Sequence, residues 1–291
     1  MSDALRAFHT PEHQAFFWQN GPKNALLVHG FPGTPAEMRP LANRLHQTGW
    51  GTKAILLPGF GPAIADMGRY NHADWLALVI EQATALRRQG SLLLIGNSMG
   101  AALCLAAASH VVPDGLLLFA PFWRLKNQLI NALLPLARWI SRDFHPFKRT
   151  DFANPEVRHN LKRTIPDADL DDPAVQAAIR TLSIPTSTLN DVMVTGKMGY
   201  RAAATVKAPV KVIQGIADET ATLAMTRKLC SRLKNLDGLT ELPAGHDLVR
   251  LEGAPGDEAA RAALTFAARI SSAAASGETG RGSNSACLPT S

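Results

Sequence analysis

One serine, held between two glycines, gives this chain a candidate nucleophile. Ser98 is the centre of the motif G-N-S-M-G at 96–100. The apolar run 91–95 before it predicts a short buried strand, and the Ala- and Leu-rich run 101–108 after it predicts a helix. A G-x-S-x-G motif at such a junction bends the backbone sharply and exposes the serine hydroxyl above the sheet. We therefore predict that Ser98 is a catalytic nucleophile, with a small residue at a tight turn as the alternative.

A serine hydroxyl needs a base that takes its proton and a carboxylate that orients the base. One known order of these groups along a chain is serine, then acid, then histidine. Of the nine histidines, only His246 follows the carboxylates that come after a late strand. It lies in the turn after the predicted strand 238–242. We predict that His246 is the general base, and an ordinary loop histidine is the alternative.

The acid is predicted from the end of another strand. Asp218 follows the β-branched run 209–215, so it lies at the carboxyl end of a strand, where open α/β sheets bind ligands. Glu219 is the second choice because it lies one residue further into the loop. Asp247 cannot easily orient the ring of its own neighbour. We predict that Asp218 completes a triad, and a helix N-cap is its alternative role.

Two backbone N–H groups are predicted to bind the negative oxygen that forms when a carbonyl carbon is attacked. Phe31 lies in the Gly- and Pro-containing loop 29–35 after an early strand, and its N–H can join that of Met99. Loss of one such donor typically costs about 3–4 kcal/mol. Gly30 lets this loop turn close to the substrate. We expect His29 to brace the loop rather than to enter the chemistry.

Strand and helix signals alternate along the chain, which predicts an α/β fold with a mainly parallel sheet and helices on both faces. The predicted strands are 15–19, 25–29, 53–57, 91–95, 115–120, 209–214 and 238–242. The predicted helices are 36–48, 72–89, 99–109, 222–235 and 257–271.

About ninety residues without a clear strand separate the fifth and sixth predicted strands. This is too long for a loop within a compact domain. We predict a core made of 1–120 and 208–270, with a helical cap inserted at 121–207. The Ser-, Ala- and Gly-rich end of the chain, 271–291, is predicted to be a disordered tail.

The stretch 129–140 carries an apolar face at helical spacing. It can pack on the core, or it can form the wall of an acyl pocket, and the two roles are compatible. The residues expected to border the substrate are His29, Gly30, Asn97, Leu133 and Trp139.

The order and spacing of these motifs resemble those of the α/β-hydrolase superfamily, and more narrowly of compact bacterial carboxylesterases and monoacylglycerol lipases. The segments that carry the resemblance are 16–18, 26–31, 56–61, 74–75 and 96–100. The resemblance covers roughly 15–120 and 208–270. It implies an α/β-hydrolase fold and a serine esterase that cleaves short-to-medium acyl esters or monoacylglycerols through an acyl-enzyme, without a cofactor or metal.

Two positions depart from the pattern of these relatives. Phe60 replaces the histidine of their Pro-Gly-His-Gly run, which predicts a more apolar entrance. The hydrophobic residue and proline that usually follow the acid are absent from 219–222. The second departure bears on the assignment of Asp218 as the acid.

The sequence also leaves open other acyl-transfer reactions on the same triad, namely those of a thioesterase, lactonase, aminopeptidase or C–C bond hydrolase. A hydrolase-fold protein that only binds a small molecule is the alternative from a different class.

Composition agrees with a globular enzyme that acts on a small-molecule ester. The hydrophobic content is 46% and the net charge is +6, without the basic stripe that nucleic-acid binding requires. No apolar run is long enough to span a bilayer, and the first residues lack the apolar core of a signal peptide. The three cysteines have no metal-site spacing. We therefore predict a cytoplasmic protein; its oligomeric state does not follow from the sequence.

Overall fold

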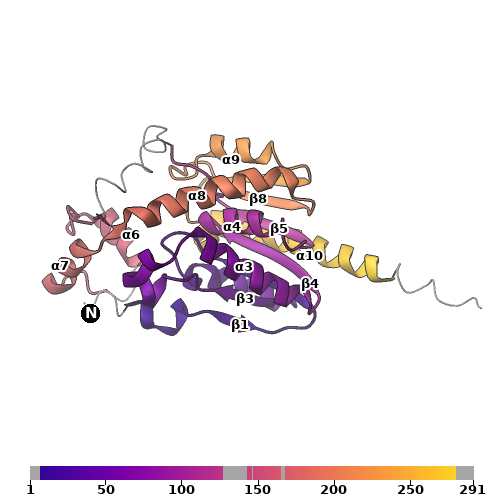
Figure 1. Cartoon of the computed structure of the whole chain (residues 1–291), viewed down its shortest axis with the longest axis horizontal. Helices are drawn as coiled ribbons and strands as arrows, with labels where there is room; N and C mark the ends of the chain where they lie inside the picture. The colour runs from indigo at the N-terminus through magenta and orange to yellow at the C-terminus, as the bar shows by residue number, and fades with distance from the viewer. Residues whose placement is uncertain (1–6, 127–142, 146, 165–167, 280–291) are drawn as a thin grey trace, which may run out of the picture.

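The computed structural model describes residues 7–126, 143–145, 147–164 and 168–279, which form a central sheet covered by helices (Figure 1). The seven strands lie in the order β1-β3-β2-β4-β5-β8-β9, and β1 alone runs antiparallel to its neighbour. Their bounds are Phe16–Trp18 (β1), Lys23–Val28 (β2), Gly51–Ile55 (β3), Ser91–Asn97 (β4), Gly115–Phe119 (β5), Val210–Gly215 (β8) and Leu236–Leu242 (β9). The predicted mainly parallel sheet is confirmed.

Helices cover both faces of the sheet because side chains alternate along its buried strands. In β2, Leu26 and Val28 join one hydrophobic core, whereas Ala25 and Leu27 join the other. The first core is covered by α3 (His72–Arg87), α4 (Met99–Ala107), α8 (Thr186–Ala202) and α9 (Leu223–Cys230). The second is covered by α2 (Arg39–Gln47) and α10 (Gly253–Thr279). The segments before and between these strands and helices contain 3-10 helices, among them η1 (Ala7–His9), η2 (Pro11–His13), η3 (Pro35–Met38), η4 (Gly61–Arg69) and η6 (Leu248–Arg250).

The last helix is longer than the sequence pattern predicts. It was expected over 257–271, but α10 runs from Gly253 to Thr279. The part of the expected disordered tail at 271–279 is therefore helical, in keeping with its alanines, which are the strongest helix formers. Residues 280–291 lie outside the described part of the chain.

The predicted insertion divides into two parts by its packing. Its helices α6 (Pro155–Thr164) and α7 (Pro173–Thr181) share a small separate core, and a short pair of strands, β6 (Asp143–Phe144) and β7 (Ile184–Pro185), accompanies them. By contrast, α8 buries Val192 and Met193 in the main core beside α4, and the 3-10 helix η5 (Ala203–Thr205) follows it. The part of the chain that packs on the central sheet thus resumes with α8, before the expected end of the insertion at 207. Leu133 and Trp139 lie outside the described residues, so their role in an acyl pocket stays a prediction.

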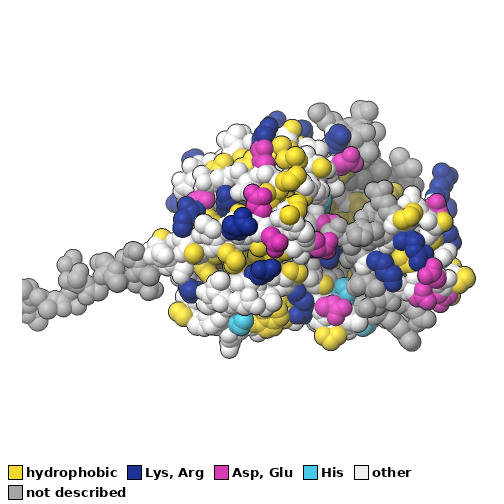
Figure 2. All heavy atoms as spheres, turned by 180° about the vertical axis from the view of Figure 1, so that it is seen from behind, with side chains coloured by type: hydrophobic (Ala, Val, Ile, Leu, Met, Phe, Trp, Pro, Cys, Tyr) yellow, Lys and Arg dark blue, Asp and Glu magenta, His cyan; other side chains and the backbone are white. Residues whose placement is uncertain are grey.

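Charged side chains of both signs are interspersed on the face that Figure 2 presents. Three ion pairs involve residues of α10 or β9: Arg44 lies 3.7 Å from Asp257, Arg227 lies 2.7 Å from Glu241, and Arg269 contacts Asp237. Within the described ranges, no helix is both long and apolar enough to cross a membrane.

Candidate active site

Ser98 lies in a strained turn between β4 and α4. Its φ of 53° and ψ of −113° are rare for a residue with a side chain. The flanking glycines allow this turn, since a Cβ at Gly96 would lie 2.5 Å from the Cα of Ala101, and one at Gly100 would lie 2.2 Å from the carbonyl oxygen of Val28. The turn holds the serine hydroxyl at the carboxyl end of the parallel strands.

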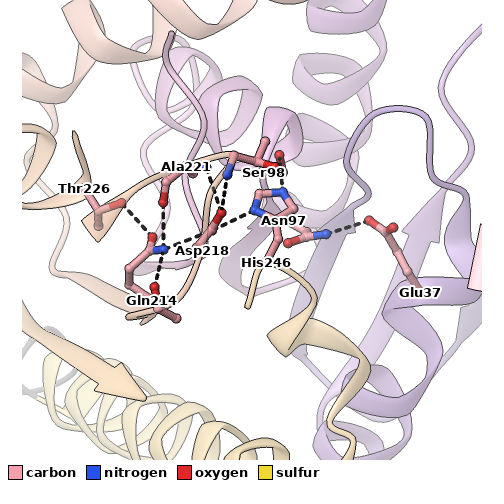
Figure 3. Close-up of polar contacts among 10 residues, drawn as sticks. Glu37, Asn97, Ser98, Gln214, Asp218, Ala221, Thr226 and His246 are labelled. Atoms are coloured by element: carbon pink, nitrogen blue, oxygen red, sulfur yellow. Dashed lines mark hydrogen bonds and ion pairs between the residues drawn. The ribbon is translucent and has the colours of Figure 1, made fainter. Parts of the chain in front are cut away.

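His246 links Ser98 to Asp218 (Figure 3). Its Nε2 lies 3.0 Å from Ser98 Oγ, and its Nδ1 lies 2.7 Å from Asp218 Oδ2. Because the carboxylate can only accept, Nδ1 carries the proton and Nε2 is left to accept the serine proton. The three residues come from loops after three different strands, β4, β8 and β9, so the sheet edge brings together what the chain separates.

Asp218 is buried and receives four hydrogen bonds. The N–H groups of Thr220 and Ala221 donate to Oδ1, each at 2.8 Å, and Gln214 Nε2 donates to Oδ2 at 3.0 Å beside His246. Burial alone raises the pKa of Asp218, but the hydrogen bond and charge of His246, with the hydrogen bonds from Ala221 and Gln214, outweigh it, so the pKa is lowered. Asp218 is therefore ionised. The runner-up, Glu219, is exposed.

The pKa of His246 is shifted in the opposite direction. Burial lowers it, but the hydrogen bond and charge of Asp218 raise it, and the charges of Asp247 and Glu37 add to this effect. The net result is a raised pKa. The imidazolium that forms when His246 takes a proton is thus stabilised by its surroundings.

Asp218 is supported by two buried residues that the sequence analysis did not identify, Gln214 and Thr226. Gln214 Nε2 donates to three acceptors, which are Asp218 Oδ2 at 3.0 Å, the carbonyl oxygen of Gly215 at 3.0 Å and that of Ala221 at 2.8 Å. Thr226 Oγ1 donates to Gln214 Oε1 at 2.6 Å. These partners fix which end of the amide is nitrogen. The signal in the sequence was one polar residue at the end of an apolar strand.

The loop that carries Phe31 is braced by His29 from within. Leu57 N donates to His29 Nε2 at 3.1 Å, so Nδ1 carries the proton and donates to the carbonyl oxygen of Gly30 at 2.8 Å. Burial lowers the pKa of His29 and outweighs the opposing effects of Glu37 and Gly30, which keeps the ring neutral. The expected brace is present. Its expected place on the border of the substrate does not fit, because His29 is fully buried and both ring nitrogens bond to the backbone.

Phe60 does not form an apolar entrance, contrary to the sequence-based expectation. Its side chain is 0% exposed. Its ring centroid lies 5.0 Å from that of His29, 6.0 Å from that of Phe31 and 5.6 Å from that of Trp75. Phe60 therefore packs beneath the loop and supports it. Asn97, also expected beside the substrate, is buried and donates to Glu37.

The comparison with protein families decides where this arrangement belongs. Residues 22–246 match the Hydrolase_4 family, described as serine aminopeptidase, S33. The chain belongs to this family. Within the described residues of this Hydrolase_4 member, no group of three or more His, Cys, Asp or Glu side chains is arranged to hold a metal ion.

Individual relatives of this Hydrolase_4 chain include lipases. The thermostable monoacylglycerol lipase of Bacillus sp. (strain H-257) is 40% identical over 98 residues, which span 33% of this chain and only 39% of that lipase. The structure of the Paleococcus ferrophilus monoacylglycerol lipase has a TM-score of 0.66 at 19% identity and covers 88% of this chain and 99% of its own.

Two further solved structures have the same fold. The structure reported for the metagenome-derived lipolytic enzymes LipS and LipT has a TM-score of 0.69 at 19% identity, covering 89% of this chain and 98% of its own. The monoglyceride lipase of Saccharomyces cerevisiae has a TM-score of 0.65 at 17% identity, covering 88% and 91%. The predicted α/β-hydrolase fold is confirmed.

Proposed function

We propose that this protein is a carboxylic ester hydrolase that works through an acyl-enzyme on Ser98. The observation that carries the proposal is the continuous chain of hydrogen bonds from Ser98 Oγ through His246 to Asp218, at 3.0 and 2.7 Å. The strained turn at Ser98 adds support, since strained backbone is concentrated at functional sites.

The reaction follows from these positions. His246 Nε2 takes the proton of Ser98 Oγ as that oxygen attacks the ester carbonyl carbon, and the N–H groups of Phe31 and Met99 stabilise the resulting oxyanion. His246 then gives the proton to the leaving alcohol, which departs and leaves an acyl-serine. His246 Nε2 then takes a proton from the water that attacks the acyl group. It returns this proton to Ser98 Oγ as the second intermediate collapses and releases the acid. Asp218 keeps the ring in the required tautomer throughout.

We propose short-to-medium acyl esters and monoacylglycerols as substrates. The similarity to proteins named monoacylglycerol lipases supports this class. The oxyanion loop is of the kind that offers a single residue, Phe31, which by family resemblance accompanies esters of primary and secondary alcohols. Each methylene of the acyl chain that is buried adds about 0.8 kcal/mol, so the rate should rise with chain length until the pocket ends.

An aminopeptidase is the second candidate, because the family that matches 22–246 is described as serine aminopeptidase. The same triad can cleave an amide, with the amine in place of the alcohol as leaving group. Amino-acid p-nitroanilides with a free amino group distinguish the two reactions from p-nitrophenyl esters.

The test is a panel of p-nitrophenyl esters from acetate to dodecanoate, run beside the p-nitroanilides. Ser98→Ala and His246→Ala should each lower kcat about 10⁴- to 10⁶-fold, and the double variant should lose little more, because triad members act as one unit. The melting temperature of each variant checks that it is folded. Equal rates for the wild type and Ser98→Ala would remove the proposal.

A further inference from the structure

A buried carboxylate lies beneath the oxyanion loop. Glu37, in η3, is 7% exposed. Its Oε1 accepts a hydrogen bond from Gly30 N at 2.6 Å and another from Asn97 Nδ2 at 2.9 Å, and Figure 3 shows the Glu37 and Asn97 side chains pointing toward each other. One oxygen atom thus joins the loop after β2 to the end of β4.

The two donors to Glu37, Gly30 N and Asn97 Nδ2, belong to residues that are close in sequence to the proposed oxyanion hole. Gly30 immediately precedes Phe31, and Asn97 lies two residues before Met99. The register of the parallel strands β2 and β4 ends at the pair Val28 and Gly96. Beyond this pair the two segments stay closely packed, since a Cβ at Gly30 would lie 3.1 Å from the Cβ of Ser98. Glu37 Oε1 therefore bridges them just past the end of the strand ladder.

The loop is shaped around this carboxylate. A Cβ at Gly33 would lie 2.3 Å from Glu37 Oε2, so a side chain there would push this carboxylate out of its place. Gly33 N donates to the carbonyl oxygen of Gly30 at 3.0 Å, which closes the turn. Burying a carboxylate is unfavourable unless it is hydrogen-bonded, and both bonds to Oε1 are made to parts of the site.

From this arrangement we propose that Glu37 is a positioning residue that sets the spacing between the two oxyanion donors, Phe31 N and Met99 N. The inference rests on the proposed esterase function. A negative charge does not itself favour the oxyanion, so the contribution of Glu37 is geometric. Its charge has a second effect, because it raises the pKa of His246 together with the larger contribution of Asp218, from the loop after β8, and that of Asp247, from the loop of His246 itself.

The test compares Glu37→Leu, which removes the acceptor, with Glu37→Gln, which keeps an acceptor oxygen and removes the charge. On a p-nitrophenyl ester, Glu37→Leu should lower kcat about 10- to 100-fold with little change in KM, somewhat less than the loss of a whole oxyanion donor. Affinity for an alkyl boronic acid, which forms a tetrahedral adduct on Ser98, should fall by a similar factor. Glu37→Gln should recover most of both.

The pH profile reports the second effect, which is that of the Glu37 charge on His246. Glu37 raises the pKa of His246, so its replacement by glutamine lowers that pKa and keeps the base neutral to lower pH. The acid limb of kcat/KM should therefore move to lower pH in Glu37→Gln. An acid limb that stays at the wild-type pH in Glu37→Gln would show that this charge does not act on His246, whereas kcat and boronic-acid affinity in Glu37→Leu report the positioning role.

The controls keep the outcomes distinct. Titration with a fluorophosphonate counts functional sites, so rates refer to folded protein. Asn97→Ala removes one of the two tethered donors and should lower kcat severalfold, whereas Asn24→Ala removes an equally buried amide at the far end of β2 and should not. Wild-type kcat in Glu37→Leu overturns the inference. If Glu37→Leu does not fold, wild-type kcat in Asn97→Ala overturns it. Activity that survives Ser98→Ala would instead overturn the esterase proposal.

Discussion

The two sides of Ser98 are held by different kinds of buried side chain. On the acid side, the neutral amide of Gln214 supports Asp218, and Thr226 holds that amide in turn. On the oxyanion side, the charged Glu37 receives Gly30 N and the amide of Asn97. Each choice follows from its neighbours, because an anion is repelled by Asp218 but is attracted by N–H donors.

The two sides also differ in the number of hydrogen bonds that hold them in place. Asp218 accepts four hydrogen bonds, two of them from backbone N–H groups that only a proline at those positions would remove. On the oxyanion side, the single oxygen Glu37 Oε1 links the loop after β2 to Asn97, and Asn97 Oδ1 has no hydrogen-bond partner among the described residues. We infer that losses on the acid side will be graded, and that the side-chain link between Gly30 and Asn97 on the oxyanion side depends on one atom.

The largest effect on the acid side is expected when its charge is removed. Asp218→Asn should lower kcat about 10³- to 10⁴-fold, because an amide facing Nδ1 favours the wrong tautomer of His246. Steady-state kinetics on a p-nitrophenyl ester measure this loss. Glu219→Gln is the matched control at the exposed neighbour and should remain near the wild-type rate. The reverse pattern would move the acid to Glu219.

A smaller effect is expected when Gln214 is replaced. Gln214→Leu removes one of the four donors to Asp218 and should lower kcat about tenfold, since a hydrogen bond to a charged group is worth about 1.5–3 kcal/mol and three donors remain. Gln214→Glu keeps the shape but places a second carboxylate against Asp218. It should be less active than Gln214→Leu at alkaline pH, where both acids are ionised. Equal pH–rate profiles for the two variants would show that a neutral side chain at position 214 is not required beside Asp218.

The smallest effect is expected at Thr226, the last residue in the chain of hydrogen bonds that runs from Asp218 through Gln214. Thr226→Val leaves Gln214 Oε1 buried without its donor, which should destabilise the fold by about 1–3 kcal/mol and lower kcat only about two- to threefold. Thermal unfolding and kinetics measure the two quantities. Thr52→Val is the matched control, since this buried hydroxyl has no partner among the described residues. A loss of stability in Thr52→Val equal to that in Thr226→Val would show that the bond to Gln214 adds nothing.

The sequence predicted those features that are local or depend on chain order. The turn at Ser98 was predictable because strand, glycines and helix are contiguous, and the positions of Asp218 and His246 followed from the strands before them. The partnership of Glu37 with Asn97 was not, because it depends on two chain segments that meet only after the sheet has formed. Phe60 was misjudged because the pattern gives the residue type and not the direction of its side chain.

The small core of α6 and α7 has a consequence for moving this insertion between proteins. Phe8, from the beginning of the chain, is buried in the same cluster as Phe152, Leu161 and Ile179. The insertion therefore is not a self-contained module. A chimera that received α6 and α7 without the segment around Phe8 would expose part of this hydrophobic cluster to solvent. Transfer of the insertion to another protein therefore requires two segments that are distant in the sequence.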